Sequence, residues 1–375
     1  MKKFKKTILA SAMVMASGST LAADLESMEA TLRTLQAQVA NLQAQLAEQK
    51  ATVAKVSQEH AAHGPGADAE HDAHGHGDWT KGISISGVVE ASMARTDVSG
   101  GEDTESFNLD TVELEIHSHL TEFAEAEVVL LYEDGSDPAD NDELTVDAAT
   151  ITFTPAFMGP FAFTIGKDGV PLTSGETMGA NDPYNMDFAD FGGQRIAQLG
   201  FEMESGLYGS LTAFRAEGTG NSDGGAELGY AFEGEDLSAD IAVAYVNDLR
   251  NNDVDLKETI NYRAMVATGP WTGIAEYTVG DGIGGAADTK ATNLELGYGF
   301  RVGDMDNNFA VAWRKLDDAS GNVTENVTEK KAKVAALTLG VAENAAVILE
   351  YLDDDHSGSA AEDSNTATAK FVYEF

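Results

Sequence analysis

The sequence predicts an all-β transmembrane barrel of about 16 antiparallel strands, preceded by an N-terminal α-helical coiled coil. Three observations lead to this fold class. From residue 79 onward, apolar and polar residues alternate with a period of two, in segments separated by turns rich in Asp, Gly and Asn. Residues 24–58 instead follow a heptad pattern, and residues 1–23 have the composition of a secretory signal peptide.

The clearest strand is the last one, residues 366–375, with the sequence TATAKFVYEF. Its odd-numbered positions, from Ala367 to Phe375, are apolar, whereas four of its five even-numbered positions are polar. Ten residues are enough for a tilted strand to cross a bilayer. A soluble sandwich, the alternative, would leave this strand as an aggregation-prone edge. Closure of a barrel in a membrane removes the edge and turns the apolar row toward lipid.

Composition limits the partners of the chain. Its 375 residues include 63 acidic and 23 basic side chains, for a formal net charge of -40, and no cysteine. Nucleic acid is excluded as a partner because its phosphates would be repelled. A mean hydropathy of -0.21 is ordinary for a barrel in contact with outer-membrane lipid, because the inward face and the loops of such a barrel are polar.

The N-terminal region is predicted to have three parts. Residues 1–23 contain four lysines and a short apolar run, which predicts a signal peptide cleaved after Ala23. Residues 24–58 carry a seam of Leu, Val and Met in steps of three and four, which predicts a periplasmic coiled coil and a homo-oligomer formed through residues 25–56. A lone amphipathic helix packed on the barrel is the alternative. The seam does not decide between dimer and trimer.

Residues 59–78 form a linker rich in His, Gly, Ala and Asp. Imidazole is a ligand for zinc, copper and nickel, so this tract is a weak candidate for metal capture, although it lacks the spacing of a structural site. A flexible hydrophilic spacer is the other interpretation. The candidate ligands are His60, His63, His71, His74 and His76.

Residues 79–375 are expected to form the barrel, with both of its ends on the periplasmic side because the number of strands is even. In the segment 291–300, Leu294, Leu296 and Tyr298 are expected to face lipid, and Asn293 and Glu295 to face inward. Aromatic residues near the strand ends suit interfacial girdles. These are Trp79, Trp271, Tyr132, Tyr351 and Tyr373.

One strand combines carboxylates and imidazoles on a single face. In residues 112–120 the inward row is predicted to be Glu113, Glu115, His117 and His119, and the next strand adds Glu125 and Glu127. These side chains are candidates for contact with a cation or a metal chelate in the lumen. Ordinary polar lining of the lumen is the alternative.

The longest segment without strand periodicity is residues 170–193. A loop of this length is usually functional or disordered. Inside a barrel it would set the size and charge of the pore, and its acidity would favour cations over anions. An extracellular loop is the other possibility. Its acidic candidates are Glu176, Asp182, Asp187 and Asp190.

The sequence contains no HExxH motif and no cysteine nucleophile. It therefore predicts neither an enzyme nor a bound cofactor.

Several short motifs stand between residues 79 and 214: VVLLYE at 128–133, VDAATITF at 146–153, Gly166-Lys167, Val170-Pro171, Asn181-Asp182-Pro183, LGFE at 199–202 and GLYG at 206–209. With these motifs the chain resembles the LbtU family of siderophore porins, which share the architecture of a signal peptide, a coiled coil, a linker and a barrel. The chain differs in reading Asp147-Ala148-Ala149 where the family tends to have Asp-Glu-Ala, and Pro171-Leu172-Thr173 where it tends to have Pro-Phe-Gly. The resemblance implies an outer-membrane barrel that takes up an iron–siderophore complex.

Two classes of function remain open at the level of the sequence. The first is a porin-like channel for small solutes, either an iron–siderophore complex or, more generally, cations. The second is a structural protein whose periplasmic coiled coil contacts the cell wall and whose barrel serves as its mount.

Overall fold

The computed structural model describes residues 82–133, 144–174, 176–188, 193–215, 223–249, 256–282, 287–318, 327–358 and 363–375. The predicted signal peptide, coiled coil and histidine-containing linker lie outside these residues, as does Trp79. No helix in the described ranges is long and apolar enough to span a bilayer.

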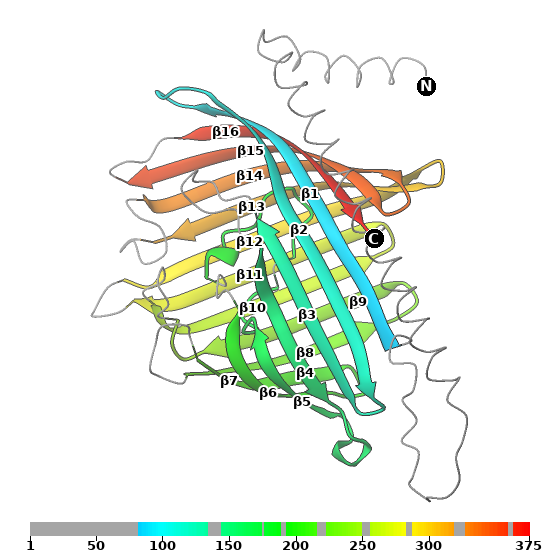
Figure 1. Cartoon of the computed structure of the whole chain (residues 1–375). Coiled ribbons are helices and arrows are strands. Elements are labelled where there is room, and N and C mark those ends of the chain that lie inside the picture. The colour runs from blue at the N-terminus through cyan, green and yellow to red at the C-terminus, as the bar shows by residue number, and fades with distance from the viewer. Residues whose placement is uncertain are drawn as a thin grey trace, which may run out of the picture. The chain divides into compact units, whose positions relative to one another are not determined.

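The described residues form a closed barrel of 16 strands in which every strand is antiparallel to its neighbours in sequence and β1 pairs with β16 (Figure 1). Two short 3-10 helices, η2 (Ala156–Met158) and η3 (Met186–Phe188), interrupt the series. The strands are β1 (Ile83–Val98), β2 (Thr104–Thr121), β3 (Ala124–Glu133), β4 (Thr145–Phe153), β5 (Phe161–Asp168), β6 (Gln194–Glu202), β7 (Leu207–Arg215), β8 (Asp223–Glu233), β9 (Leu237–Val246), β10 (Leu256–Thr268), β11 (Trp271–Gly282), β12 (Thr289–Val302), β13 (Met305–Asp317), β14 (Val327–Ala342), β15 (Ala345–Gly358) and β16 (Ser364–Glu374).

The predicted barrel of about 16 antiparallel strands is confirmed. The alternation of side chains is confirmed as well, and β12 shows it clearly. Leu294, Leu296 and Tyr298 are 47%, 49% and 40% exposed on the outer face, whereas Asn293 and Glu295 are buried on the inner face. An apolar outer row and a polar inner row are what a strand between lipid and an aqueous lumen requires.

The two ends of the barrel differ in their connections. At one end β10–β11, β12–β13 and β14–β15 are joined by two-residue turns. Phe375 lies at this end, where its backbone N–H and C=O pair with Gly87 at 3.1 Å. Bacterial barrels have short periplasmic turns and longer extracellular loops, which places the C-terminus at the periplasmic end. Trp271 and Tyr298 pack edge to face at this end, with their ring centroids 4.9 Å apart.

Candidate functional site: a loop inside the barrel

The described residues between β5 and β6, residues 169–174 and 176–188, fold into the barrel and form the inner loop, which Figure 1 shows in green within the ring of strands. The described residues of this inner loop contact inward side chains as far round the ring as β15. Because β5 and β13 are eight positions apart in a ring of sixteen strands, the loop reaches the wall opposite its own attachment. The sequence left an inward and an extracellular position open, and the described residues of the segment lie inside the barrel.

Apolar packing holds the two ends of the inner loop. Val170, Leu172 and Phe188 of the loop join a buried cluster with inward residues of the wall. Leu172 is 0% and Phe188 1% exposed. Full burial of each such side chain contributes about 1.5–3 kcal/mol. The wall and neighbouring loop residues of this cluster are Ile196, Phe214, Ala244, Val246, Leu249, Leu256, Ala291 and Leu316.

Two wall carboxylates accept hydrogen bonds from the middle of the inner loop. Glu276 on β11 accepts from the backbone N–H of Ser174 at 3.1 Å and from its hydroxyl at 3.3 Å. Glu295 on β12 accepts from the Thr177 hydroxyl at 3.0 Å and from the Met178 N–H at 2.8 Å. Charge-assisted bonds of this kind are stronger than bonds between neutral groups, so both carboxylates fix the path of the loop.

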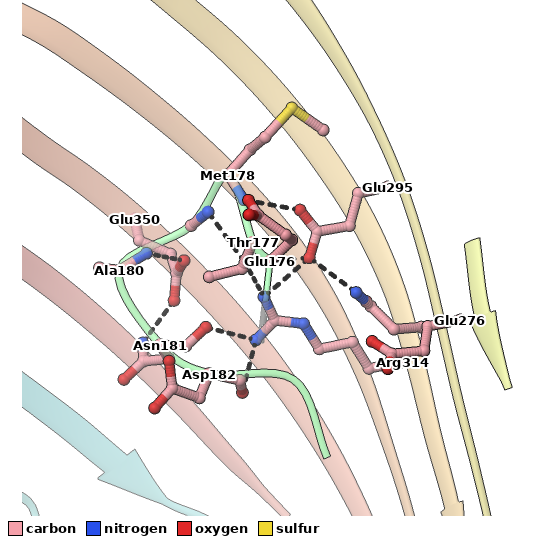
Figure 2. Close-up of polar contacts among 12 residues, drawn as sticks. Glu176, Thr177, Met178, Ala180, Asn181, Asp182, Glu276, Glu295, Arg314 and Glu350 are labelled. Atoms are coloured by element: carbon pink, nitrogen blue, oxygen red, sulfur yellow. Dashed lines mark hydrogen bonds and ion pairs between the residues drawn. The ribbon is translucent and has the colours of Figure 1, made fainter. Parts of the chain in front are cut away.

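Arg314 on β13 is the cation at the centre of these contacts, and its side chain is 1% exposed. Figure 2 shows its guanidinium between Glu295 and the inner loop. It donates to the carbonyl oxygens of Asn181 and Asp182 at 2.9 and 3.0 Å, and to the Thr177 hydroxyl at 2.9 Å. It also pairs with Glu295 at 3.3 Å. One guanidinium thus ties three loop residues to the barrel wall.

The tip of the inner loop is attached to β15. Glu350 accepts from the Ala180 N–H at 2.6 Å and from the Asn181 side-chain amide. The space for this contact depends on Gly179, because a Cβ there would lie 2.2 Å from the Glu350 carboxylate. Farther along, the Tyr184 hydroxyl donates to Asp354 at 2.6 Å. We call Glu276, Glu295, Arg314 and Glu350 the anchor cluster.

The anchor cluster contains three carboxylates and one guanidinium, all of them almost completely buried. The excess negative charge is offset by backbone N–H groups of Ser174, Met178 and Ala180, which point at the carboxylates. Hydrogen bonds to the ionised form are what make a buried carboxylate tolerable. The N–H donors of the inner loop and the carboxylate acceptors of the wall therefore complete each other's hydrogen bonding.

The predicted acidic row lies in a different part of the wall. Glu113, Glu115, His117 and His119 share one face of β2, which pairs through His117↔Glu127 and His119↔Glu125 with the inward row of β3. Glu115 accepts from Ser86 at 2.9 Å. We call these four residues, with Glu125 and Glu127, the acidic wall. Since β3 and β11 are eight positions apart, the acidic wall lies across the ring from the first anchor carboxylate.

Contacts within the acidic wall are looser than those of the anchor cluster. His117 lies 3.4 Å from Glu115, and His119 lies 3.0 Å from Glu125. The His119 and Glu125 side chains are 71% and 58% exposed, so these pairs are solvated and contribute little to stability. The negative charge of the Glu115 and Glu125 carboxylates is therefore available to ions in the lumen. Among the described residues, no group of three or more His, Asp or Glu side chains is arranged to hold a metal ion.

The acidic candidates of the inner loop separate into two groups. Glu176 and Asp182 are exposed, and Asp182 uses only its backbone carbonyl in the contact with Arg314. The side chain of Asp187 and the whole of Asp190 lie outside the described residues, as do His60, His63, His71, His74 and His76. The structure thus brings two of the predicted loop carboxylates into the barrel.

The sequence did not point to Glu276, Arg314 or Glu350 as site residues, and it gave Glu295 only as an inward position. A signal for Arg314 exists nevertheless, because it stands in the inward row of its strand between Ala312 and Leu316. A cation between two apolar inward neighbours requires a partner. The strand pattern alone does not say which segment supplies it.

A second ion pair, with both side chains half-buried, lies on the inner face in the periplasmic half of the wall. Arg263 on β10 pairs with Glu227 on β8. Beside it, Tyr208 on β7 donates to Asp240 on β9 at 2.9 Å, across Gly229 of β8. A Cβ on Gly229 would lie 2.2 Å from the Tyr208 ring, so this hydrogen bond requires a glycine there. These contacts link the four neighbouring strands β7, β8, β9 and β10.

Comparison with known proteins supports the fold. No family model and no curated protein matches the sequence. Among solved structures, OprB of Pseudomonas putida at high pH has a TM-score of 0.61 at 12% identity, over 79% of this chain and 95% of its own. An anion-selective porin from Comamonas acidovorans has a TM-score of 0.57 at 13% identity, over 78% of this chain and 99% of its own.

The outer-membrane channel DcaP of Acinetobacter baumannii is a further neighbour, with a TM-score of 0.54 at 11% identity, over 78% of this chain and 97% of its own. Two of these neighbours are described as a channel and a porin. The described residues thus form a barrel with the fold of outer-membrane porins.

Proposed function

We propose that this protein is an outer-membrane, porin-like channel for small solutes, with a lumen that favours cations. The observation that carries the proposal is the inner loop, which is anchored inside the barrel by Glu276, Glu295, Arg314 and Glu350. A segment fixed in this way narrows the passage and presents defined charges to it. The porin fold of the structural neighbours supports the same function.

The preference for cations follows from which charges are exposed. Glu115 and Glu125 of the acidic wall, and Glu176 and Asp182 of the inner loop, have exposed side chains. Arg314, by contrast, is buried and paired with Glu295, so the carboxylate neutralises its positive charge and little of that charge reaches the lumen. Carboxylates along a pore attract cations and repel anions.

Within this function, the resemblance to the LbtU family implies an iron–siderophore complex as the solute. The charge of the lumen restricts which ferric complexes we propose as solutes, because an acidic passage disfavours anionic chelates. We therefore expect neutral or cationic ferric complexes to enter more readily than anionic ones. A passage for small cations in general is the broader version of the same proposal.

The experiment is conductance of the purified full-length protein in a planar bilayer, under a salt gradient that gives the reversal potential. Cation selectivity with block by a cationic or neutral ferric chelate would support siderophore uptake. Cation selectivity without block by any chelate would leave a general cation channel. A protein that is folded and inserted but gives no conductance would overturn the proposed channel function.

A further inference from the structure

Glu276 is the anchor carboxylate with the weakest hold on the inner loop. It accepts from the N–H and the hydroxyl of Ser174 at 3.1 and 3.3 Å, which are long distances for hydrogen bonds. Ser174 is exposed, so water competes for its hydroxyl. The ion pairs of the described residues do not include Glu276, whereas Glu295 pairs with Arg314. The loop contact at Glu276 is therefore the one most easily exchanged for another partner.

A cation stands directly opposite Glu276 on the neighbouring strand. Arg263 on β10 pairs in register with Glu276 on β11. Residues in such positions point to the same face of the sheet, with their Cβ atoms about 4.5–5.5 Å apart, and opposite charges there attract each other. The guanidinium of Arg263 nevertheless pairs with Glu227. The carboxylate nearest to Arg263 in the sheet is thus not the one that it uses.

The contact with Glu227 spans two strand spacings. Glu227 lies on β8, with β9 between it and Arg263 on β10. Neighbouring strands are about 4.8 Å apart, so the two side chains together bridge about 10 Å. The residues of β9 opposite Arg263 and Glu227 are Ala242 and Ala244, which are 8% and 1% exposed. Their small side chains leave the room in which the arginine crosses β9.

Arg263 can serve only one of the two carboxylates at a time. Glu227 on β8 and Glu276 on β11 are three strands apart, or about 14 Å, and lie on opposite sides of Arg263. One arm of the guanidinium is also left over, because Nη1 is buried without a hydrogen-bond partner among the described residues. A buried donor without a partner is unfavourable. The present arrangement of Arg263 is therefore not its only favourable one.

We propose that Arg263 exchanges between Glu227 and Glu276, and that this exchange releases the Ser174 end of the inner loop. In the structure Arg263 pairs with Glu227, which leaves Glu276 to hold Ser174. In the alternative arrangement Arg263 pairs with Glu276, and the loop loses this attachment while the other anchors remain. Glu227 is thus a positioning residue that keeps a competing cation away from the loop anchor. The inference concerns the inner loop and does not depend on which solute passes.

The test measures the rate of thiol labelling at Glu176→Cys, two residues after Ser174, in the full-length protein, which has no other cysteine. We expect Glu227→Gln to raise this rate about three- to tenfold, because Arg263 loses its partner and turns to Glu276. Adding Arg263→Gln removes the competing cation, so the rate is expected to return to that of the parent. Labelling is read without any current, so its outcome is separate from that of the conductance experiment.

The matched control is Asp306→Asn. It also removes the carboxylate partner of an arginine, since Asp306 pairs with Arg301 at 2.8 Å, but this pair is exposed at the periplasmic end of the barrel. The labelling rate is expected to stay at the parent value. A rise as large as that in Glu227→Gln would make the effect one of net charge and overturn the proposal.

Two further outcomes would also overturn it. One is an unchanged labelling rate in folded Glu227→Gln. The other is a rise that persists after Arg263→Gln is added, because loss of Glu227 alone would then loosen the loop. If Glu227→Gln does not fold, Glu227→Asp keeps the charge but shortens its reach by one methylene. The rate is expected to rise in that variant as well and to fall back with Arg263→Gln, and an unchanged rate there would refute the exchange.

Discussion

Replacement of Arg314 by methionine is expected to release the inner loop from the barrel wall. The substitution keeps an unbranched apolar side chain in place but removes the guanidinium that donates to Asn181, Asp182 and Thr177. It also leaves Glu295 without its cation in a site where both side chains are 1% exposed. Loss of one partner of a buried ion pair costs about 3–5 kcal/mol. The equilibrium between docked and undocked loop would therefore shift about 10²- to 10⁴-fold toward the undocked form.

Two measurements follow the loop directly. Single-channel recording is expected to show a larger or noisier open-channel current in Arg314→Met than in the parent. The chain has no cysteine, so Glu176→Cys, at an exposed loop position, provides one thiol whose rate of labelling reports the accessibility of the loop. That rate is expected to rise in the Arg314→Met background. Arg301→Met is the control, because it removes an exposed arginine far from the anchor cluster.

A second substitution separates loss of attachment from a buried unpaired charge. Adding Glu295→Gln to Arg314→Met removes the orphaned carboxylate, so the double variant is expected to be more stable than Arg314→Met alone. Its loop stays more accessible than in the parent because the guanidinium is still missing. Unchanged current and unchanged labelling in a folded Arg314→Met protein would refute the assignment of Arg314 as the anchor.

The other predictions concern the acidic wall, the contact of Tyr208 with Asp240 across Gly229, and the N-terminal region. Glu113→Gln with Glu115→Gln is expected to lower the cation-to-anion permeability ratio about two- to fivefold, measured by reversal potential, while conductance stays similar. Gly229→Ala is expected to lower the free energy of unfolding by about 1–3 kcal/mol in urea, whereas Gly200→Ala, with its nearest neighbour at 3.8 Å, serves as the tolerated control. Deletion of residues 24–58 is expected to leave conductance unchanged; loss of solute entry would contradict the assignment of transport to the barrel. Replacement of His71, His74 and His76 by alanine is expected to abolish zinc binding measured by calorimetry, and unchanged binding would remove the metal-capture proposal.

The barrel was predictable from the sequence because the alternation of apolar and polar residues that indicates a strand is a local pattern. A period of two assigns each residue to one face without knowledge of the partner strand, and β9 (Leu237–Val246) begins and ends where the alternation does. Strand ends were less predictable. β15 continues to Gly358, six residues beyond the apolar alternation that ends at Leu352. Its extension, DDDHSG, is polar on both faces and is held by backbone pairing to β14.

The site was only partly predictable, because its contacts join distant parts of the chain. The acidic wall could be found from β2 and β3 alone, since strands adjacent in sequence pair with each other. The contact between Ala180 and Glu350 joins residues 170 positions apart. Sequence periodicity says that Glu350 faces inward but contains no information on the path of a loop without strand periodicity. Only the folded loop shows which inward carboxylates receive its N–H groups.

The inward carboxylates therefore have two different roles, although the sequence presents them alike. Those of Glu276, Glu295 and Glu350 are buried and take up the donors of the inner loop, so their charge is used in holding it. Those of Glu115 and Glu125 are solvated, and their charge remains for ions that pass. The anion-selective porin from Comamonas acidovorans has a similar fold at 13% identity. A shared barrel thus leaves selectivity open, and the solvated side chains of the inner rows, more than the total charge, are the residues that would determine it.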